Sequence, residues 1–505
     1  MALRKILGLE TEFGILHRGR GDTNPIAASS KLINAYVSTV GAVGAAGSPV
    51  SVRVGWDFVD ETPSLDARGE LVHGSYAPEV ETHLVNAVLT NGARYYVDHA
   101  HPELSAPECA DALDVVRYDR AAELILQDSM AAVNATLPEG EEIVVYKNNS
   151  DRKGNSYGTH ENYLMDRTVP FGRIVAHVTP HFITRQIFTG AGKVGSEAAG
   201  VSSAQVPFQL TQRADFFEEE VGLETTLKRP IVNTRDEPHA DAKKYRRLHV
   251  IVGDANLAQV ATFLKVGTTA IVLCMIEDDA IGAPRVFADP VRTLRDASYD
   301  LTLRVPHRLD DGTTITALDH QWELLGRAKA YAERVDLVDL VGASAPMVLD
   351  RWERVLGGLE RDPMDLADQL DWVAKLRLFE AYRTRNGLEW GDARLAAMDL
   401  QYHDLRPGRS LAAKVGLEVL VTDEDARLAT TEPPSDTRAF FRGRCLQRWS
   451  DRIIAANWDS MVFDVGGDPL RRVPMMEPTR GTAAHVGSLL EECATPAELL
   501  ARLGS

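Results

Sequence analysis

The first strand expected in this chain carries two glutamates on one face, and this limits what the rest of the fold can be. Residues 3–16, LRKILGLETEFGIL, alternate between polar and apolar side chains as a β-strand does. Glu10 and Glu12 therefore share one face, while Leu9 and Phe13 share the other. Paired carboxylates repel each other unless water or a cation neutralises them, and Mg²⁺ prefers such oxygen ligands. The pair predicts a metal-binding face, and the exposed face of an edge strand is the alternative.

Two further segments bring polar side chains together at strand spacing. In NGARYYVD, residues 91–98, a cation, a phenol and a carboxylate share one strand face through Arg94, Tyr96 and Asp98. A structural salt bridge between Arg94 and Asp98 is the alternative explanation. The segment GTHEN places His160 in another expected strand, so a third set of polar ligands is available.

A run of charged residues precedes a further expected strand. Residues 233–249 contain Arg235, Arg246 and Arg247 and end on His249. Guanidinium groups bind phosphate and carboxylate oxygens in a fixed geometry, so the run suits a substrate that carries either group. A solvated charge run is the alternative, but this one leads directly into an apolar strand.

Strands and helices mix along the chain without regular βαβ alternation, which predicts an α+β fold on an antiparallel sheet. We expect helices near 25–40, 112–136, 209–220 and 255–277. Pro433-Pro434 marks a boundary between a catalytic domain, residues 1–430, and a small C-terminal domain, residues 431–505.

Residues 41–80 form a long insertion rich in Gly, Ser and Pro. They show little periodicity, so we expect a mobile loop that buries little apolar surface. A gating role and a tolerated surface insertion are both open for it.

Composition and charge exclude several classes of protein. The chain has 505 residues with 55 Lys and Arg against 73 Asp and Glu, a net charge of −18 that disfavours a nucleic-acid binder. The four cysteines are scattered, which fits reduced thiols. The N-terminus lacks a signal-like apolar core, and the apolar run AIVLCMI at 270–276 is too short to span a membrane. We expect a cytoplasmic protein with no membrane contact.

Several long motifs resemble one family, the carboxylate–amine ligases of the Pup system within the glutamine-synthetase-like superfamily. They are GLETEFG, NGARYYVD, KNNSDRKGNSYGTHENYL, TRQIFTGAGKV, NTRDEPHADAKKYRRLHVIVGDAN and DLQYHD. The resemblance runs from Ile6 to about Asp464. It implies a curved antiparallel sheet that forms a cradle backed by helices, with a small C-terminal domain.

The resemblance also implies a ligand set and cofactors. It assigns bound ATP, or ADP and phosphate, together with Mg²⁺. Asp98 corresponds to the family's essential aspartate, which acts as general base or as nucleophile. The other roles carried over are metal ligation by Glu10, Glu12, Tyr96, Glu103, His160 and His249, nucleotide contact by Arg94, Ala106, Trp458 and Arg246, and substrate contact by Arg235 and Arg247.

The family has two branches with opposite tasks on Pup, a small acidic modifier protein that marks proteins for the proteasome. One branch ligates Pup to substrate lysines with ATP. The other deamidates the C-terminal glutamine of Pup and cleaves the Pup–lysine isopeptide bond of pupylated proteins. The 41–80 insertion and the segment VDHAHPE are similar to the hydrolase branch, so we expect an ATP- and Mg-dependent amidohydrolase. A Pup ligase and a silent Pup-binding scaffold are the alternatives.

Overall fold

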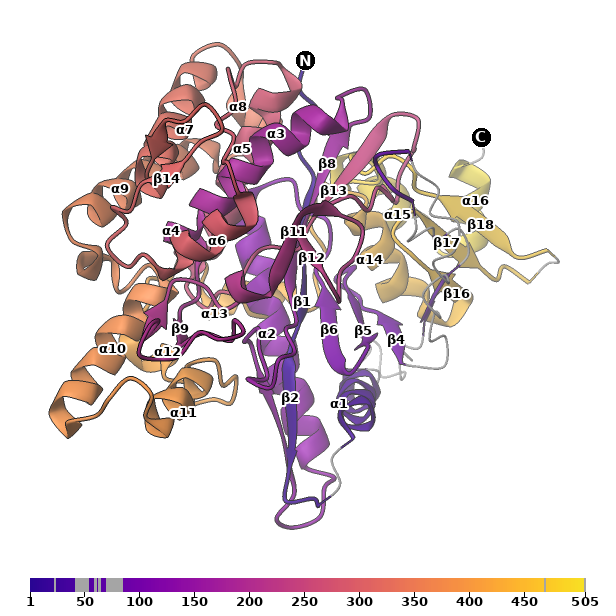
Figure 1. Cartoon of the computed structure of the whole chain (residues 1–505). Coiled ribbons are helices and arrows are strands. Elements are labelled where there is room, and N and C mark those ends of the chain that lie inside the picture. Colours follow the sequence, from indigo (N-terminus) through magenta and orange to yellow (C-terminus); the bar gives the residue numbers. More distant parts are fainter. Residues whose placement is uncertain are drawn as a thin grey trace.

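A ten-stranded sheet runs through the molecule and carries most of the polar motifs (Figure 1). The computed structural model describes residues 1–21, 24–40, 54–58, 61, 65–69, 85–466 and 469–503. In sheet order the strands are β13 (Tyr245–Val250), β8 (Thr159–Asp166), β1 (Leu7–Glu12), β6 (His101–Ser105), β5 (Arg94–Asp98), β4 (Asn86–Val88), β3 (Gly55–Trp56), β16 (Ile453–Ala456), β17 (Ser460–Phe463) and β18 (Arg471–Pro474).

Neighbouring strands of this sheet are antiparallel, with one exception. β3 and β16 are parallel, so the sheet is mixed where the expectation was purely antiparallel. The remaining strands form two-stranded pairs, which are β2 (Gly14–Arg18) with β7 (Glu142–Tyr146), β9 (Lys193–Val194) with β10 (Phe208–Gln209), β11 (Phe217–Gly222) with β12 (Arg229–Asn233), and β14 (His307–Arg308) with β15 (Thr314–Ile315).

Helices pack against the sheet, as the α+β prediction requires, with the larger group on one face and the helix Ala439–Trp449 against Val88 on the other (Figure 1). They are α1 (Pro25–Val40), α2 (Ala112–Asn134), α3 (Phe171–Thr184), α4 (Gln186–Thr189), α5 (Gln259–Glu277), α6 (Pro290–Tyr299), α7 (Ala317–Ala332), α8 (Leu337–Val341), α9 (Ala345–Arg361), α10 (Asp371–Asn386), α11 (Ala393–Tyr402), α12 (Ala412–Val415), α13 (Asp423–Ala429), α14 (Ala439–Trp449), α15 (Ala483–Glu492) and α16 (Pro496–Leu503).

Strand alternation explains which side of the sheet the helices cover. Leu7 and Leu9 of β1 and Tyr163 of β8 point into a core shared with α2, α3 and α5. Tyr95 and Val97 of β5 pack with α1 and α2 in an adjoining core. The alternate residues of the same strands must therefore project from the opposite face.

The central helix α5 is apolar around its whole circumference and is buried, as expected for residues 270–276. Among the described residues it is the one helix with the length and hydropathy to cross a membrane, and 94% of its apolar window is buried within the protein. Burial inside the protein accounts for this composition.

Two expectations from the sequence are wrong. Residues 209–220 form no long helix, because Phe217–Gly222 alternates buried and exposed side chains and forms strand β11. Most of the 41–80 insertion lies outside the described residues, together with the mobility expected for it. Its described residues are 54–58, 61 and 65–69. Residues 54–58 include β3, and Trp56 is only 6% exposed. This part does bury apolar surface.

The C-terminal residues build a core of their own that is continuous with the main sheet. Phe441, Trp449 and Phe463 pack together, and Val54 and Trp56 of the insertion join them. β3 links the two parts, since it pairs with β4 on one side and β16 on the other. The division of the chain at residues 430 and 431 stays a prediction.

We expect the buried ion pair between Glu161 and Arg185 to be a large single contribution to stability. Arg185 donates to both Glu161 oxygens, at 2.6 and 2.8 Å, and both side chains are inaccessible to solvent. Arg185→Met leaves a buried carboxylate without its cation, so the free energy of unfolding should fall by about 3–5 kcal/mol. Thermal and denaturant unfolding measure the loss.

Arg292→Met is the matched control. Its pair with Asp296 is largely exposed, with an N–O distance of 3.4 Å, and such a pair contributes about 0–1 kcal/mol. Equal unfolding midpoints for the two variants would contradict the assignment.

Candidate active site on the carboxylate face

One row of paired residues crosses the face of the sheet opposite Leu7 and Leu9, at the middle of β1. His160 of β8 pairs with Glu10 of β1. Ser105 of β6 pairs with Glu10 on the other side and with Arg94 of β5. Directly paired residues project on the same face, so these side chains stand in line across four strands.

A second row lies two residues further along β1. Glu12 pairs with Glu103 of β6, Glu103 pairs with Tyr96 of β5, and Tyr96 pairs with Asn86 of β4. The two rows share one face because strand residues two apart point the same way. We call this surface the carboxylate face and define it by Glu10, Glu12, Glu103, Tyr96 and Asp98.

Glu10 stands between two histidines. Its Oε1 lies 3.5 Å from Nδ1 of His160 and 3.4 Å from Nδ1 of His249. One ligand atom from each of the three residues falls within 4.8 Å of the others. Burial raises the pKa of Glu10, but the hydrogen bond with His160 and the positive charges nearby outweigh burial and lower it. Glu10 is therefore held ionised.

The pKa of Glu103 is shifted in the opposite direction to that of Glu10. Burial raises its pKa well above the ordinary value, and the negative charges of Asp98, Glu12 and Glu10 raise it further. Burial likewise raises the pKa of Glu12. Carboxylates that repel one another in a buried position are stabilised by hard cations, which bind oxygen ligands. The donor set therefore fits Mg²⁺.

Glycine at position 158 makes room for this arrangement. The backbone amide of Gly158 donates a hydrogen bond of 2.8 Å to Glu12 Oε2. A Cβ at this position would overlap the ring of His160. A side chain here would displace His160 from Glu10.

Asp98 ends β5 at the edge of the carboxylate face. Its Oδ2 lies 2.7 Å from Nδ1 of His99. Asp98, His99 and Glu12 each offer one ligand atom within 4.8 Å of the others. Burial raises the pKa of Asp98, but the hydrogen bond and charge of His99 lower it by more, so the net shift is downward. The carboxylate is ionised at neutral pH and ready to accept a proton or attack a carbonyl.

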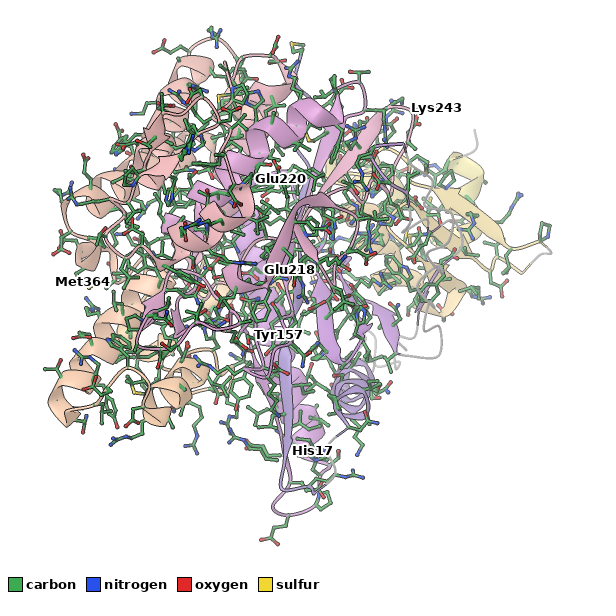
Figure 2. All side chains as sticks on the ribbon, in the orientation of Figure 1. His17, Tyr157, Glu218, Glu220, Lys243 and Met364 are labelled. Atoms are coloured by element: carbon green, nitrogen blue, oxygen red, sulfur yellow. The ribbon has the colours of Figure 1, made fainter. Side chains whose placement is uncertain are left out.

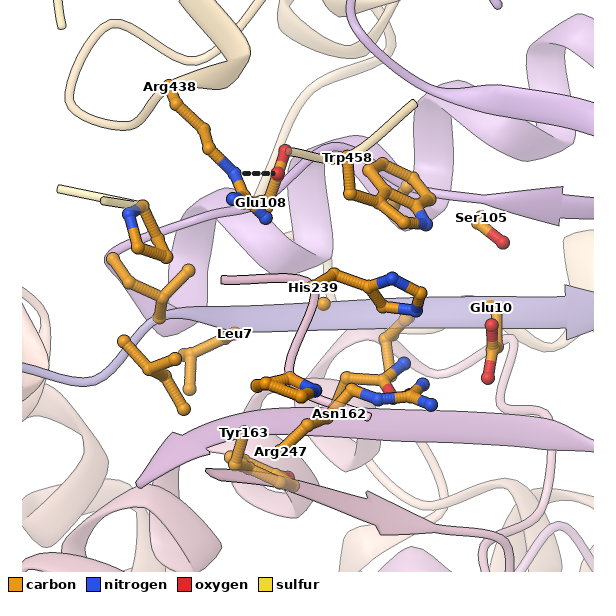
Figure 3. A pocket seen from close by; sticks show the side chains of 17 residues that line it. Leu7, Glu10, Ser105, Glu108, Asn162, Tyr163, His239, Arg247, Arg438 and Trp458 are labelled. Atoms are coloured by element: carbon orange, nitrogen blue, oxygen red, sulfur yellow. Dashed lines mark hydrogen bonds and ion pairs between the residues drawn. The ribbon is translucent and has the colours of Figure 1, made fainter. Parts of the chain in front are cut away.

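A cavity of about 90 Å³ opens beside Glu10 at the other end of the face (Figure 3). Ala106, Trp458 and Arg247 line it, and all three were expected near a nucleotide or a substrate. The backbone N–H of Ala106 already donates to the Leu9 carbonyl at 2.8 Å, so the amide is not available to a ligand.

Arg94 lies in a cage of aromatic rings at this end. Its guanidinium carbon is 4.1 Å from the ring centre of Trp56 and 3.9 Å from that of Tyr96. Its Nε donates to Asn86 Oδ1 at 3.0 Å. Trp56 also meets Trp458 edge to face at 5.2 Å. The arginine is oriented by cation–π contacts and one hydrogen bond.

The three expected arginines of residues 233–249 are not all brought to the site. Arg247 lines the cavity and donates to Asn162 Oδ1 at 2.9 Å. Arg235 lies close enough for its charge to lower the pKa of Arg247, after the larger effect of burial. Arg246 points to the helix face, where it bonds to Asp236 and the Val169 carbonyl. Adjacent strand residues face opposite ways, so Arg246 cannot join Arg247.

The basic run does not form one patch. Lys243 is exposed and lies at the edge of the molecule in Figure 2, away from Tyr157 near the centre. Lys244 is paired with Glu477 and Asp241.

Four residues around the cavity had no site role assigned from the sequence: Asn162, His239, Arg438 and Glu108 (Figure 3). Asn162 follows His160 by two positions, so strand alternation could have identified it. Arg438 directly precedes α14 and donates to Glu108 Oε1 at 2.7 Å. No local pattern connects these two residues, which are far apart in the sequence.

Comparisons with known proteins identify the proteins that this chain resembles. A sequence model of the Pup-ligase protein family matches residues 5–462. The depupylase of Acidothermus cellulolyticus is 50% identical and covers 99% of this chain and 99% of its own. The Pup deamidase/depupylase of Mycolicibacterium smegmatis is 47% identical and covers 99% of this chain and 100% of its own. The Pup–protein ligase of a Nocardioides species is 39% identical, and the match covers 80% of this chain and 90% of the ligase.

Two solved structures are similar over most of the chain. The complex between Pup and its ligase PafA has a TM-score of 0.79 at 30% identity, covering 99% of this chain and 94% of that one. PafA with ADP has a TM-score of 0.72 at 34% identity, and the match covers 80% of this chain and 89% of that one. The expected glutamine-synthetase-like fold is confirmed.

The raised pKa of Glu103 makes a prediction for the metal-free protein. The folded state holds the proton more tightly than the unfolded chain, so stability is lost as the pH rises from the ordinary pKa towards the raised one. Glu103→Gln removes this loss, so with a chelator present the variant should be more stable than wild type by at least about 1 kcal/mol near pH 8, and by less near pH 5. Denaturant unfolding at the two pH values measures both differences.

Glu491→Gln is the control, because Glu491 is exposed and lies in the C-terminal helix α15. A Glu103→Gln variant less stable than wild type at the higher pH would show that repulsion does not dominate at this position.

Proposed function

The chain belongs to the Pup-ligase family, and we propose that it is a hydrolase that deamidates the C-terminal glutamine of Pup and cleaves the Pup–lysine isopeptide bond. The observation that carries the proposal is the match to depupylases along 99% of the chain, whereas the ligase relatives match 80%. An ionised Asp98 at the edge of the carboxylate face supports amide hydrolysis at this position.

The cofactors of this proposal are Mg²⁺ and ATP, or ADP with phosphate. Glu10, Glu12, Tyr96, Glu103, His160 and His249 would hold the metal. Arg94, Trp458 and Ala106 would contact the nucleotide, Ala106 through atoms other than its bonded N–H. Support comes from the repulsion among the carboxylates and from the ADP complex of the PafA relative. When bound, Mg²⁺ and the phosphates supply charge that stabilises an oxyanion near the carboxylate face.

Asp98 acts on the amide in one of two ways. As a general base it takes a proton from water, and the water oxygen bonds to the side-chain carbonyl carbon of the glutamine or of the isopeptide. Asp98 then returns the proton to the leaving nitrogen as the C–N bond breaks. As a nucleophile it attacks the same carbon, the amine leaves, and water then hydrolyses the resulting anhydride. Both routes need the ionised carboxylate, and both end with the glutamate form of Pup, together with ammonia from the glutamine or a free lysine amine from the conjugate.

Arg247 and Arg235 would hold the carboxylate groups at the C-terminus of Pup. Arg247 is buried beside the cavity and faces Asn162, which keeps its guanidinium fixed. A fixed guanidinium binds a carboxylate with little loss of side-chain entropy. The cytoplasmic location stays a prediction.

Hydrolysis and ligation differ in how they use ATP. Ligation consumes one nucleotide for each bond formed, whereas amide hydrolysis needs none, so the nucleotide remains a bound cofactor. A catalytically inactive Pup-binding scaffold would bind Pup without changing it chemically.

The test is turnover of Pup that ends in glutamine and of a Pup–lysine conjugate, followed by mass spectrometry with ATP consumption measured alongside. We expect conversion to the glutamate form and to free target, without matching ATP consumption. Asp98→Asn should slow both reactions by about 10²–10⁴-fold, the range expected for a lost acid–base group, while ADP binding stays unchanged.

Two results would contradict the proposal. Near-wild-type turnover by Asp98→Asn would remove this residue from the mechanism. ATP consumption equal to product formed, with new conjugates appearing, would identify a ligase.

A further inference from the structure

A two-residue turn joins β5 to β6 and places a histidine next to Asp98. Asp98 pairs with His101 across the hairpin, so His99 and Ala100 form the turn. His99 has a φ of 51°, in the left-handed region that residues with a Cβ rarely occupy. This backbone conformation accompanies a hydrogen bond of 2.7 Å between His99 Nδ1 and Asp98 Oδ2.

We infer that His99 is a positioning residue for Asp98, an inference that rests on the role proposed above for this aspartate. The ionised carboxylate can only accept hydrogen bonds, so His99 Nδ1 carries the proton and donates it. The bond restricts rotation of the carboxylate about its Cβ–Cγ bond and occupies Oδ2. Oδ1 is then the oxygen that meets the water or the substrate carbonyl.

Stability alone does not account for this contact. The His99 side chain is 67% exposed and that of Asp98 is 36% exposed, and ion pairs at such positions contribute little to folding. The left-handed backbone is itself unfavourable for a residue with a Cβ, and glycine would fit the turn better. The other histidine of the hairpin, His101, stacks on Tyr157 at 4.3 Å and serves packing instead.

The experiment compares three variants in steady-state hydrolysis of Pup that ends in glutamine. His99→Gly removes the donor and relaxes the turn. His99→Asn keeps an N–H donor and tolerates the left-handed conformation. Ala100→Gly loosens the same turn without touching His99 and serves as the matched control.

We expect His99→Gly to lower kcat by about 10–100-fold, the range seen when a residue that orients an active-site group is lost, with KM for Pup unchanged. His99→Asn should recover most of the lost kcat, and Ala100→Gly should match wild type. In an Asp98→Asn background, His99→Gly should cause no further loss, because both changes act on the same carboxylate.

Wild-type kcat in His99→Gly would overturn the inference, as would His99→Asn being as slow as His99→Gly. A changed Mg²⁺ requirement for nucleotide binding in His99→Gly would also overturn it, because His99 would then be a metal ligand. Failure of the proposed function looks different: Asp98→Asn would itself remain active. If Asp98→Asn is inactive and His99→Gly is fully active, the positioning role of His99 is wrong and the proposed function still holds.

Discussion

Electrostatic repulsion among carboxylates held on one face of a rigid sheet is the constraint on which this structure depends. Glu12 and Glu103 are paired directly across β1 and β6, and Glu10 lies two residues from Glu12 on the same face. Strand register keeps these groups from moving apart, so the charge must be balanced by cations or protons. Histidines and Arg247 surround Glu10, and a bound metal would balance the remaining charge.

The opposite face explains how the sheet withstands this repulsion. Every strand that presents a carboxylate also buries apolar residues against helices, as Leu9 and Tyr95 do. Glu161, beside His160 in sequence, points to the helix side and is neutralised by Arg185. The strands therefore tolerate the charge at the site, because apolar packing and the Glu161–Arg185 ion pair on the helix side stabilise the same strands.

Strand periodicity made much of the site predictable. The residues that it missed were missed for physical reasons. Alternation places Glu10, Glu12, Arg94, Tyr96 and Asp98 correctly, and it should also have excluded Arg246. Arg438 and His239 reach the cavity from segments distant in sequence, so only tertiary packing brings them there. β3 was missed because two residues in a Gly- and Ser-rich insertion show no period, and their pairing with β4 and β16 is a long-range contact.

The most direct test of this account is Mn²⁺ binding in the presence of ADP, followed by the loss of the free-ion signal in electron paramagnetic resonance. Mn²⁺ replaces Mg²⁺ at sites of oxygen ligands. We expect wild type and Glu491→Gln to bind Mn²⁺ with ADP, and Glu10→Gln and Glu103→Gln to bind it much more weakly. Equal Mn²⁺ binding by all four proteins would contradict the claim that the carboxylate face is the metal site.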